Sequence, residues 1–383
     1  MDQAAVNRIA LNTTALLSPK TGIGRYILEL AQRLSDMPEW DASFFYGAFW
    51  SKDVRGQTPP TVAGLLPAVR RYLPYSYELR RWVQCHRFQH HNEGGHFALY
   101  HEPNNVPLPF DGPLVLTVHD LSWIRYPAMH PTERVRAMNR HFEPGLRRAT
   151  RIITDSQCVK DELAAQFGVN PELIHPIALG ASAAFVPRAA EDTWAVLQSH
   201  QLTHGRYILA LGTLEPRKNL GVAIAAYSQL PARLQEQFPL VIVGMTGWLS
   251  ESIERLIGPL RAKGLIRQLG FLPEDDLPQV VAGATCMVYP SVYEGFGLPP
   301  LEAMACGVPV ITSNAAAVAE VVGDAGMLMH PQDTDAFAQT MQHLLDNPEA
   351  RDAQAAQGLQ RSAVFSWERC AEQTRNVYRL AAI

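Results

Sequence analysis

The sequence predicts an α/β protein made of two doubly wound domains, each with a parallel sheet covered by helices on both faces. Its 383 residues exceed the roughly 250–300 that one core accommodates. Hydrophobic residues make up 47% of the chain, which is enough to fill two cores. Short apolar runs rich in branched residues alternate with helical periodicity, and the alternation starts again near the middle of the chain.

In the first half, six apolar runs predict buried parallel strands, and the segments between several of them have helical spacing. The strands are expected at 8–12, 43–49, 96–103, 113–120, 151–156 and 173–180. The helices are expected at 23–34, 132–149 and 157–167.

The second half repeats the pattern. Its strands are expected at 206–212, 239–244, 284–291 and 309–313, with helices near 219–230, 250–263, 275–283, 299–306 and 333–346. The small residues of 178–193 predict a linker, so we place the domain boundary near residue 185. The expected domains are therefore 1–185 and 186–365, followed by a final helical segment, 366–383, which has no strand of its own.

Composition and charge exclude several classes of protein. A net charge of -4 provides no basic field for nucleic acid. Five scattered cysteines without a Cys-x-x-Cys pair favour reduced thiols over a zinc site. The sequence has neither a signal peptide nor an apolar run of about 20 residues, so we expect a cytoplasmic protein.

A glycine loop follows the first predicted strand. Gly22 and Gly24 precede a helix whose N–H groups could hold a phosphate, although an ordinary tight turn explains them as well. The third glycine of a dinucleotide-binding fingerprint is absent, and this disfavours a nicotinamide-dependent oxidoreductase.

Two adjacent cations, Arg217 and Lys218, follow the first strand of the second half and precede a predicted helix. The helix dipole disfavours cations at this end. The sequence therefore predicts a compensating anion such as a diphosphate, unless the two side chains are simply exposed.

The segment 290–310 carries two carboxylates eight positions apart. Glu294 is expected in a glycine-rich loop and Glu302 on the following helix, whose first turn suits Pro299 and Pro300. A glycosidase-like carboxylate pair is an alternative, but nothing in the sequence fixes the separation that such a pair requires.

This segment resembles the two-glutamate motif of retaining glycosyltransferases of the GT-B fold, a large family that includes sucrose synthase and bacterial mannosyltransferases. Four further motifs occur in the same order as in that family: 22–26 (GIGRY), 118–120 (VHD), 154–156 (TDS) and 215–219 (EPRKN). The resemblance covers essentially the whole chain and implies two Rossmann-like domains that face each other across a cleft. Residues 114–131 are most similar to enzymes that build O-antigen or exopolysaccharide.

The resemblance implies roles for individual residues. Arg217 and Lys218 match the pair that neutralises the departing donor diphosphate. Glu302 matches the glutamate that binds the ribose hydroxyls, and His119 matches a strand-end histidine beside the donor sugar. The residues that match the grip on the donor sugar are Glu294, Gly295, Phe296, Gly297 and Leu298.

Further correspondences concern loops and the chain end. Gly22 and Gly24 match the loop that closes over the diphosphate and the acceptor. Phe271 and Leu272 fall where the family holds the nucleobase through the backbone. The segment 366–383 resembles a helix that crosses back onto the N-terminal domain.

The resemblance implies transfer of a hexose from a nucleotide sugar to a hydroxyl with retention, and same-face attack is the usual proposal. By likeness the donor is GDP-mannose, with a GDP-deoxyhexose or a UDP-hexose as the alternatives. The acceptor is a glycan or a polyprenyl-diphosphate-linked sugar. The competing classes are an oxidoreductase, an epimerase of the same fold and a non-catalytic sugar-nucleotide-binding protein.

No cofactor or metal is expected beyond the donor itself. A literal Asp-x-Asp occurs at Asp333 and Asp335, but it precedes an apolar-periodic helix, so helix capping explains it. The stretch 69–88 concentrates arginines and aromatic rings, which suits peripheral contact with the inner face of a membrane. A helix pair that is buried or lies on the acceptor side is the alternative.

Overall fold

The computed structural model describes residues 7–18, 22–54, 76–92, 97–248 and 251–382. The chain forms two compact units, each built around one sheet. The first unit comprises Met1–Leu121, Thr132–Leu179 and Trp367–Ile383, and the second comprises Ser122–Pro131 and Gly180–Ser366. Within the described ranges, no helix has both the length and the apolar character needed to cross a membrane.

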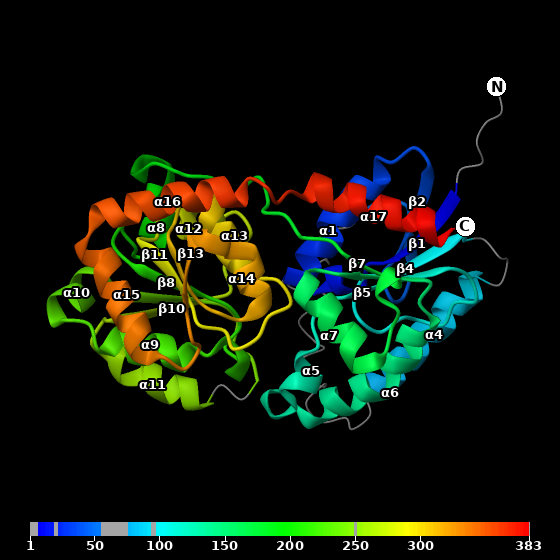
Figure 1. Cartoon of the computed structure of the whole chain (residues 1–383), viewed down its shortest axis with the longest axis horizontal. Coiled ribbons are helices and arrows are strands. Elements are labelled where there is room, and N and C mark those ends of the chain that lie inside the picture. The colour runs from blue at the N-terminus through cyan, green and yellow to red at the C-terminus, as the bar shows by residue number, and fades with distance from the viewer. Residues whose placement is uncertain (1–6, 19–21, 55–75, 93–96, 249–250, 383) are drawn as a thin grey trace. The chain divides into compact units, whose positions relative to one another are not determined.

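The first unit has a seven-stranded sheet in the order β3-β2-β1-β4-β5-β6-β7, and only the β2–β3 pair is antiparallel. The strands are β1 (Asn7–Asn12), β2 (Trp40–Phe45), β3 (Trp50–Ser51), β4 (Leu99–Glu102), β5 (Leu114–Val118), β6 (Arg151–Thr154) and β7 (Ile174–Pro176). The helices are α1 (Gly22–Ser35), α4 (Ser76–Asn92), α6 (Thr132–Arg148), α7 (Gln157–Phe167) and α17 (Trp367–Ala381) (Figure 1).

The second unit has six parallel strands in the order β10-β9-β8-β11-β12-β13. The strands are β8 (Ile208–Leu211), β9 (Leu240–Val243), β10 (Ile266–Gly270), β11 (Cys286–Tyr289), β12 (Val310–Ser313) and β13 (Gly326–Met329). The helices are α5 (Ser122–Arg125), α8 (Ala190–Ser199), α9 (Leu220–Ser228), α10 (Ala232–Gln237), α11 (Glu251–Ala262), α12 (Leu277–Ala282), α13 (Leu298–Ala305), α14 (Ala316–Val322), α15 (Thr334–Asp346) and α16 (Pro348–Ser362).

Side-chain alternation along the strands builds the two cores of the second unit. Ile208 and Ala210 point into the cluster that contains the apolar faces of α9, α11 and α15. Because successive strand residues point to opposite faces, the residues between them line the other face, which α13 covers. Both predicted doubly wound sheets are therefore confirmed (Figure 1).

The apolar patterns do not predict three of the strands, and all three lie at sheet edges. β10 and β13 border the second sheet, and β3 borders the first. Most of their residues are only partly buried. An edge strand lacks a neighbour on one side, so its apolar pattern is weak.

The second unit begins at Gly180, within the predicted linker and a few residues before the predicted boundary near residue 185. Phe185 is fully buried there, and Pro187 lies close to Gly307. The segment Ser122–Pro131, which the prediction placed in the first domain, also belongs to the second unit. Its Tyr126 ring packs on Tyr293 at a centroid distance of 5.6 Å.

Helix α17 belongs to the first unit, and the second unit ends at Ser366. Trp367 and Tyr378 are buried against that unit. The Tyr378 hydroxyl lies 2.7 Å from Nδ1 of His101, a buried strand residue whose pKa burial lowers to about 3. The end of the chain thus completes the first core.

Each sheet has one point where the strand order reverses. In the first unit this point lies between β1 and β4, and in the second between β8 and β11. Open α/β sheets bind ligands beyond the carboxyl ends of the strands at such points. The loops after these four strands are therefore the places to look for a site.

Candidate functional site

Two loops of the second unit meet at its strand-order reversal. Arg217 and Lys218 lie in a 3-10 turn after β8, which Asn219 ends with a φ of 54°. The Asn219 amide donates to the carbonyl of Pro290 at 3.0 Å, and the N–H of Val292 donates to the carbonyl of Arg217 at 3.0 Å. These bonds hold the loop after β8 against the loop after β11.

A buried ion cluster occupies this junction. Glu294 accepts from Arg217 Nη1 through Oε2 and from Lys218 Nζ through Oε1, both at 2.6 Å. Glu215 accepts from Arg217 Nη2 at 2.9 Å. The Tyr289 hydroxyl donates to Glu294 at 2.8 Å and accepts from Lys218 at 3.0 Å.

The cluster keeps its members charged in spite of burial. Burial alone would raise the pKa of Glu294, but Arg217 and Lys218 lower it to about 2. Burial opposes the charge of Lys218 as well, yet Glu294 raises its pKa. Burial and Glu294 raise the pKa of Tyr289 to about 12, so its hydroxyl keeps its proton.

The anion that the sequence predicts beside these two cations is present within the chain itself, and a bound diphosphate stays a prediction. Arg217 and Lys218 precede α9 in the 3-10 turn, and two carboxylates of the chain compensate them. Glu215 is only two residues from Arg217, so the local sequence is enough to suggest this ion pair. Glu294 is 77 positions from Arg217, so only folding pairs them.

The other predicted residues of the second unit follow β10 and β11. Gly295, Phe296 and Gly297 continue the loop, and Gly297, with a φ of 125°, precedes α13. Glu302 is buried on α13. Phe271 and Leu272 follow β10; the former is 49% exposed and the latter is buried. Their ligand roles stay predictions, as does that of Leu298, the first residue of α13.

In the first unit, His119 follows β5 and forms a buried dyad with Asp155. His119 Nδ1 lies 2.7 Å from Asp155 Oδ2, and Nε2 lies 2.8 Å from the carbonyl oxygen of Pro103. A carbonyl can only accept, so Nε2 carries a proton. Burial raises the pKa of Asp155, and Asp155 raises that of His119 against burial.

Both ring nitrogens of His119 are thus occupied within the unit. The ring is held as a proton-carrying partner of Asp155 and has no lone pair free to act as a base. The predicted place of His119 beside the donor sugar stays a prediction. Asp155 lies within the motif 154–156, but nothing in the sequence indicates that it pairs with His119.

The predicted glycine loop is helical where the structure describes it. Gly22 is the first residue of α1, and Gly24 is buried in its first turn. Residues 19–21 lie outside the described ranges. The two glycines therefore begin a helix after β1 and are not themselves in a loop.

A buried carboxyl network that no sequence pattern indicates lies at the strand-order reversal of the first unit. Glu102 Oε2 accepts from Asn12 at 2.7 Å and from the Tyr100 hydroxyl at 2.5 Å. Its Oε1 accepts from the N–H of Asn104 at 3.1 Å. Burial outweighs these bonds and raises the pKa of Glu102 to about 7.

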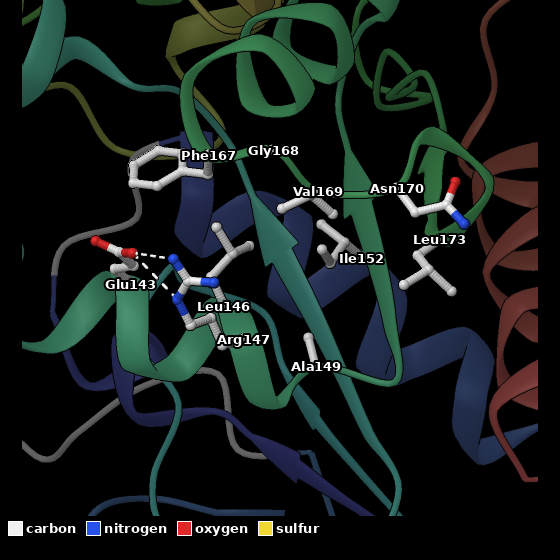
Figure 2. A pocket seen from close by; sticks show the side chains of 10 residues that line it. All are labelled: Glu143, Leu146, Arg147, Ala149, Ile152, Phe167, Gly168, Val169, Asn170 and Leu173. Carbon is white, nitrogen blue, oxygen red and sulfur yellow. Dashed lines mark hydrogen bonds and ion pairs between the residues drawn. The ribbon is translucent and has the colours of Figure 1, made fainter.

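A pocket of about 240 Å³ lies elsewhere, near the amino end of β6 (Figure 2). Ala149 and Ile152 line it together with an ion pair between Glu143 and Arg147. None of the predicted site residues lines it. Because ligands of such sheets bind at the opposite, carboxyl edge, this pocket is not the candidate site.

The predicted capping role of Asp333 is confirmed. Its Oδ1 accepts from the N–H of Ala336 at 3.0 Å at the start of α15. Asp335 accepts from the amide of Gln229 at 3.0 Å. Both aspartates of the Asp-x-Asp thus accept hydrogen bonds from groups of the second unit.

Two doubly wound domains are the architecture of GT-B glycosyltransferases, and family models assign the chain to them. The model described as "Glycosyl transferases group 1" matches residues 193–361, and "Glycosyltransferase Family 4" matches 20–184. The chain belongs to the group 1 glycosyltransferases. This result removes the oxidoreductase alternative.

The chain is 36% identical to O-antigen chain mannosyltransferase B of Escherichia coli, over 97% of this chain and 100% of that protein. It is 34% identical to the serotype-specific mannosyltransferase WbdA of Escherichia coli, over 57% of this chain and 27% of that longer protein. Among solved structures, sucrose-phosphate synthase from Thermosynechococcus elongatus has a TM-score of 0.76 at 22% identity, over 97% and 98% of the two chains. Anabaena HepE, solved with UDP and glucose, has a TM-score of 0.72 at 19% identity, over 97% and 99%.

The raised pKa of Glu102 predicts a pH-dependent stability. Between the ordinary carboxyl pKa and about 7, the folded chain binds a proton that the unfolded chain has released. The free energy of unfolding should therefore fall by about 2–3 kcal/mol as the pH rises from about 5 to about 8. Urea unfolding across this range measures it.

Glu102→Gln should lack this part of the pH dependence. Glu143→Gln, which changes an exposed carboxylate of the same unit, should follow the wild-type curve. Parallel curves for wild type and Glu102→Gln would show that Glu102 is ionised in the folded chain at neutral pH.

Proposed function

We propose that this glycosyltransferase is a retaining mannosyltransferase that uses GDP-mannose. The 36% identity to an O-antigen chain mannosyltransferase over nearly the whole chain supports a role in bacterial surface polysaccharide synthesis. The acceptor in this proposal is a hydroxyl of a glycan or of a lipid-linked oligosaccharide. A GDP-deoxyhexose or a UDP-hexose donor is the alternative.

The observation that carries the proposal is the cluster of Arg217, Lys218 and Glu294. Breaking the bond between the sugar and the diphosphate places negative charge on the leaving oxygen. Two fixed cations in a buried site stabilise that charge far better than water does, because the local dielectric is low. The cluster thus suits diphosphate departure.

In the proposed reaction, the bond between the anomeric carbon and the diphosphate oxygen breaks, and the acceptor oxygen bonds to the same face of that carbon. The acceptor proton passes to the departing phosphate oxygen. Configuration is retained, and the protein contributes positioning and electrostatics in place of a general base.

The remaining residues receive their roles from the resemblance. Glu302 binds the ribose hydroxyls, and the backbone near Phe271 and Leu272 holds the nucleobase. The loop from Glu294 to Leu298 holds the donor sugar. By the same resemblance, Gly22 and Gly24 belong to the segment that closes over the diphosphate and the acceptor, and His119 is the histidine beside the donor sugar.

Peripheral membrane contact is a second part of the proposal. On α4, Trp82 is 65% exposed and stacks on His86 at 5.8 Å, and Arg87 is exposed on the same helix. An exposed aromatic ring on a helix that also carries an exposed arginine suits an anionic lipid interface. We place this contact at the inner face of the cytoplasmic membrane; residues 69–75 of the predicted stretch lie outside the described ranges.

The proposed donor and stereochemistry predict a defined product. With GDP-mannose and a mannosyl acceptor, the new bond should keep the α configuration of the donor, as NMR of the anomeric proton would show.

Activity should persist in EDTA, since Arg217 and Lys218 take the place of a divalent ion. Transfer from a UDP-hexose alone, an inverted product or a requirement for Mg²⁺ would overturn the corresponding part. Epimerised donor in the absence of acceptor would indicate an epimerase.

Loss of the Lys218 cation should slow transfer. Lys218→Met keeps the aliphatic stem that packs over Gly212, and its turnover should fall about 10²-fold to 10³-fold, as for other lost transition-state donors. Lys263→Met, a change at an exposed lysine of the same unit, should leave turnover unchanged. Near wild-type turnover in folded Lys218→Met would remove Lys218 from the leaving-group role.

The membrane proposal predicts that Trp82→Ala weakens binding to vesicles of phosphatidylethanolamine and phosphatidylglycerol. A drop of roughly fivefold or more corresponds to about 1 kcal/mol of lost interfacial burial. Trp194→Ala on α8 is a matched control, because Trp194 is also 65% exposed. Equal binding of the two variants in a sedimentation assay would contradict the proposal.

A further inference from the structure

The ion cluster is electrically balanced before any ligand arrives. Arg217 and Lys218 supply two positive charges, and the buried Glu215 and Glu294 supply two negative ones. A nucleoside diphosphate carries at least two further negative charges. The diphosphate would therefore compete with these carboxylates for the same two cations.

The two carboxylates differ in how they hold the cations. Glu215 accepts from Arg217, its neighbour in the same turn. Glu294 reaches across from the loop after β11 and places one oxygen on each cation at 2.6 Å. Two anionic oxygens on two cations is the arrangement that diphosphate oxygens would themselves take.

Glu294 competes as a full anion at any pH near neutrality, because the two cations hold its pKa at about 2. It is also held by the Tyr289 hydroxyl at 2.8 Å. A ligand that takes the cations must therefore release a carboxylate that already has good partners.

We propose that Glu294 is the internal counter-ion that the donor diphosphate displaces, and that it thereby sets the preference for the intact donor over the nucleoside diphosphate product. This inference rests on the proposed function. With the intact donor, hydroxyls of the transferred sugar donate to the displaced carboxylate. The free nucleoside diphosphate also displaces Glu294 but has no sugar to satisfy it.

The consequence is a penalty that falls on the product more than on the donor. Charge-assisted hydrogen bonds lost by Glu294 are replaced only when a sugar is present. The product then leaves more readily after transfer, although it keeps the base, the ribose and both phosphates. The affinity for the nucleotide thus depends on whether Glu294 finds new hydrogen-bond partners after it is displaced.

The test is isothermal titration of wild type and Glu294→Gln with GDP, with UDP and with the corresponding sugar nucleotides. Glu294→Gln should bind the preferred nucleoside diphosphate at least tenfold more tightly than wild type does, while the intact donor gains less. The ratio of the two dissociation constants should therefore shrink. Unchanged or weaker binding of the nucleoside diphosphate would overturn the inference and leave Glu294 as a residue that only orients the cations.

Glu215→Gln is the matched control within the cluster. It removes the same charge, but from a carboxylate that accepts from Arg217 and does not bridge the two cations. It should change the affinities for nucleoside diphosphate and intact donor by a similar factor and leave their ratio unchanged. An equal change of the ratio in both variants would mean that net charge alone, and not displacement, sets the preference.

Because Glu294→Gln leaves buried cations with fewer partners, its folding must be checked by thermal unfolding. If it does not fold, Tyr289→Phe serves instead, since it removes the hydroxyl's bonds to Glu294 and to Lys218 and keeps the carboxylate. It should tighten nucleoside diphosphate binding about threefold, and no tightening would overturn the inference. Absence of nucleotide binding by wild type would instead contradict the proposed function.

Discussion

The double ion pair from Glu294 to Arg217 and Lys218 is the interaction on which the candidate site depends. Buried charges persist only when they are paired, so the loops that carry them must close on each other. Backbone bonds through Asn219 and Val292 hold the loops in that position. The reversal of strand order between β8 and β11 brings these loops together in the first place. The geometry of the site therefore follows from sheet topology and is fixed by charge.

The first unit uses the same edge of its sheet in a different way. Its strand-order reversal carries the buried Glu102 network, and the dyad of His119 and Asp155 follows β5 and β6. Their partners include the loop after β4, through the Pro103 carbonyl and Asn104. In these groups burial raises the pKa of Glu102 and of Asp155, so it favours their protonated forms. In the second unit, by contrast, two cations hold Glu294 in its ionised form.

Packing, and not chain order, divides the molecule into units. Helix α17 completes the first core, where Tyr378 bonds to His101 and Trp367 packs near Tyr26. The segment Ser122–Pro131 packs in the second unit, where Trp248 donates to the carbonyl of Met129 at 2.7 Å. Linker composition indicates where the chain passes from one unit to the other. It does not indicate which short segments pack in the other unit, because composition does not reveal distant contacts.

The pattern of apolar residues is enough to predict the two parallel sheets and the helices between their central strands, and the motifs join the chain to its family. Central strands such as β5 are buried throughout, so apolar runs report them, whereas the half-exposed β10 and β13 left no such record. The sequence also identified Arg217, Lys218 and Glu294 as residues of interest. The pairing of Glu294 with both cations, and of Asp155 with Nδ1 of His119, becomes visible only in the folded chain. These partners are separated by 77, 76 and 36 positions, and local patterns carry no information about a pair whose attraction exists only after the sheet has formed.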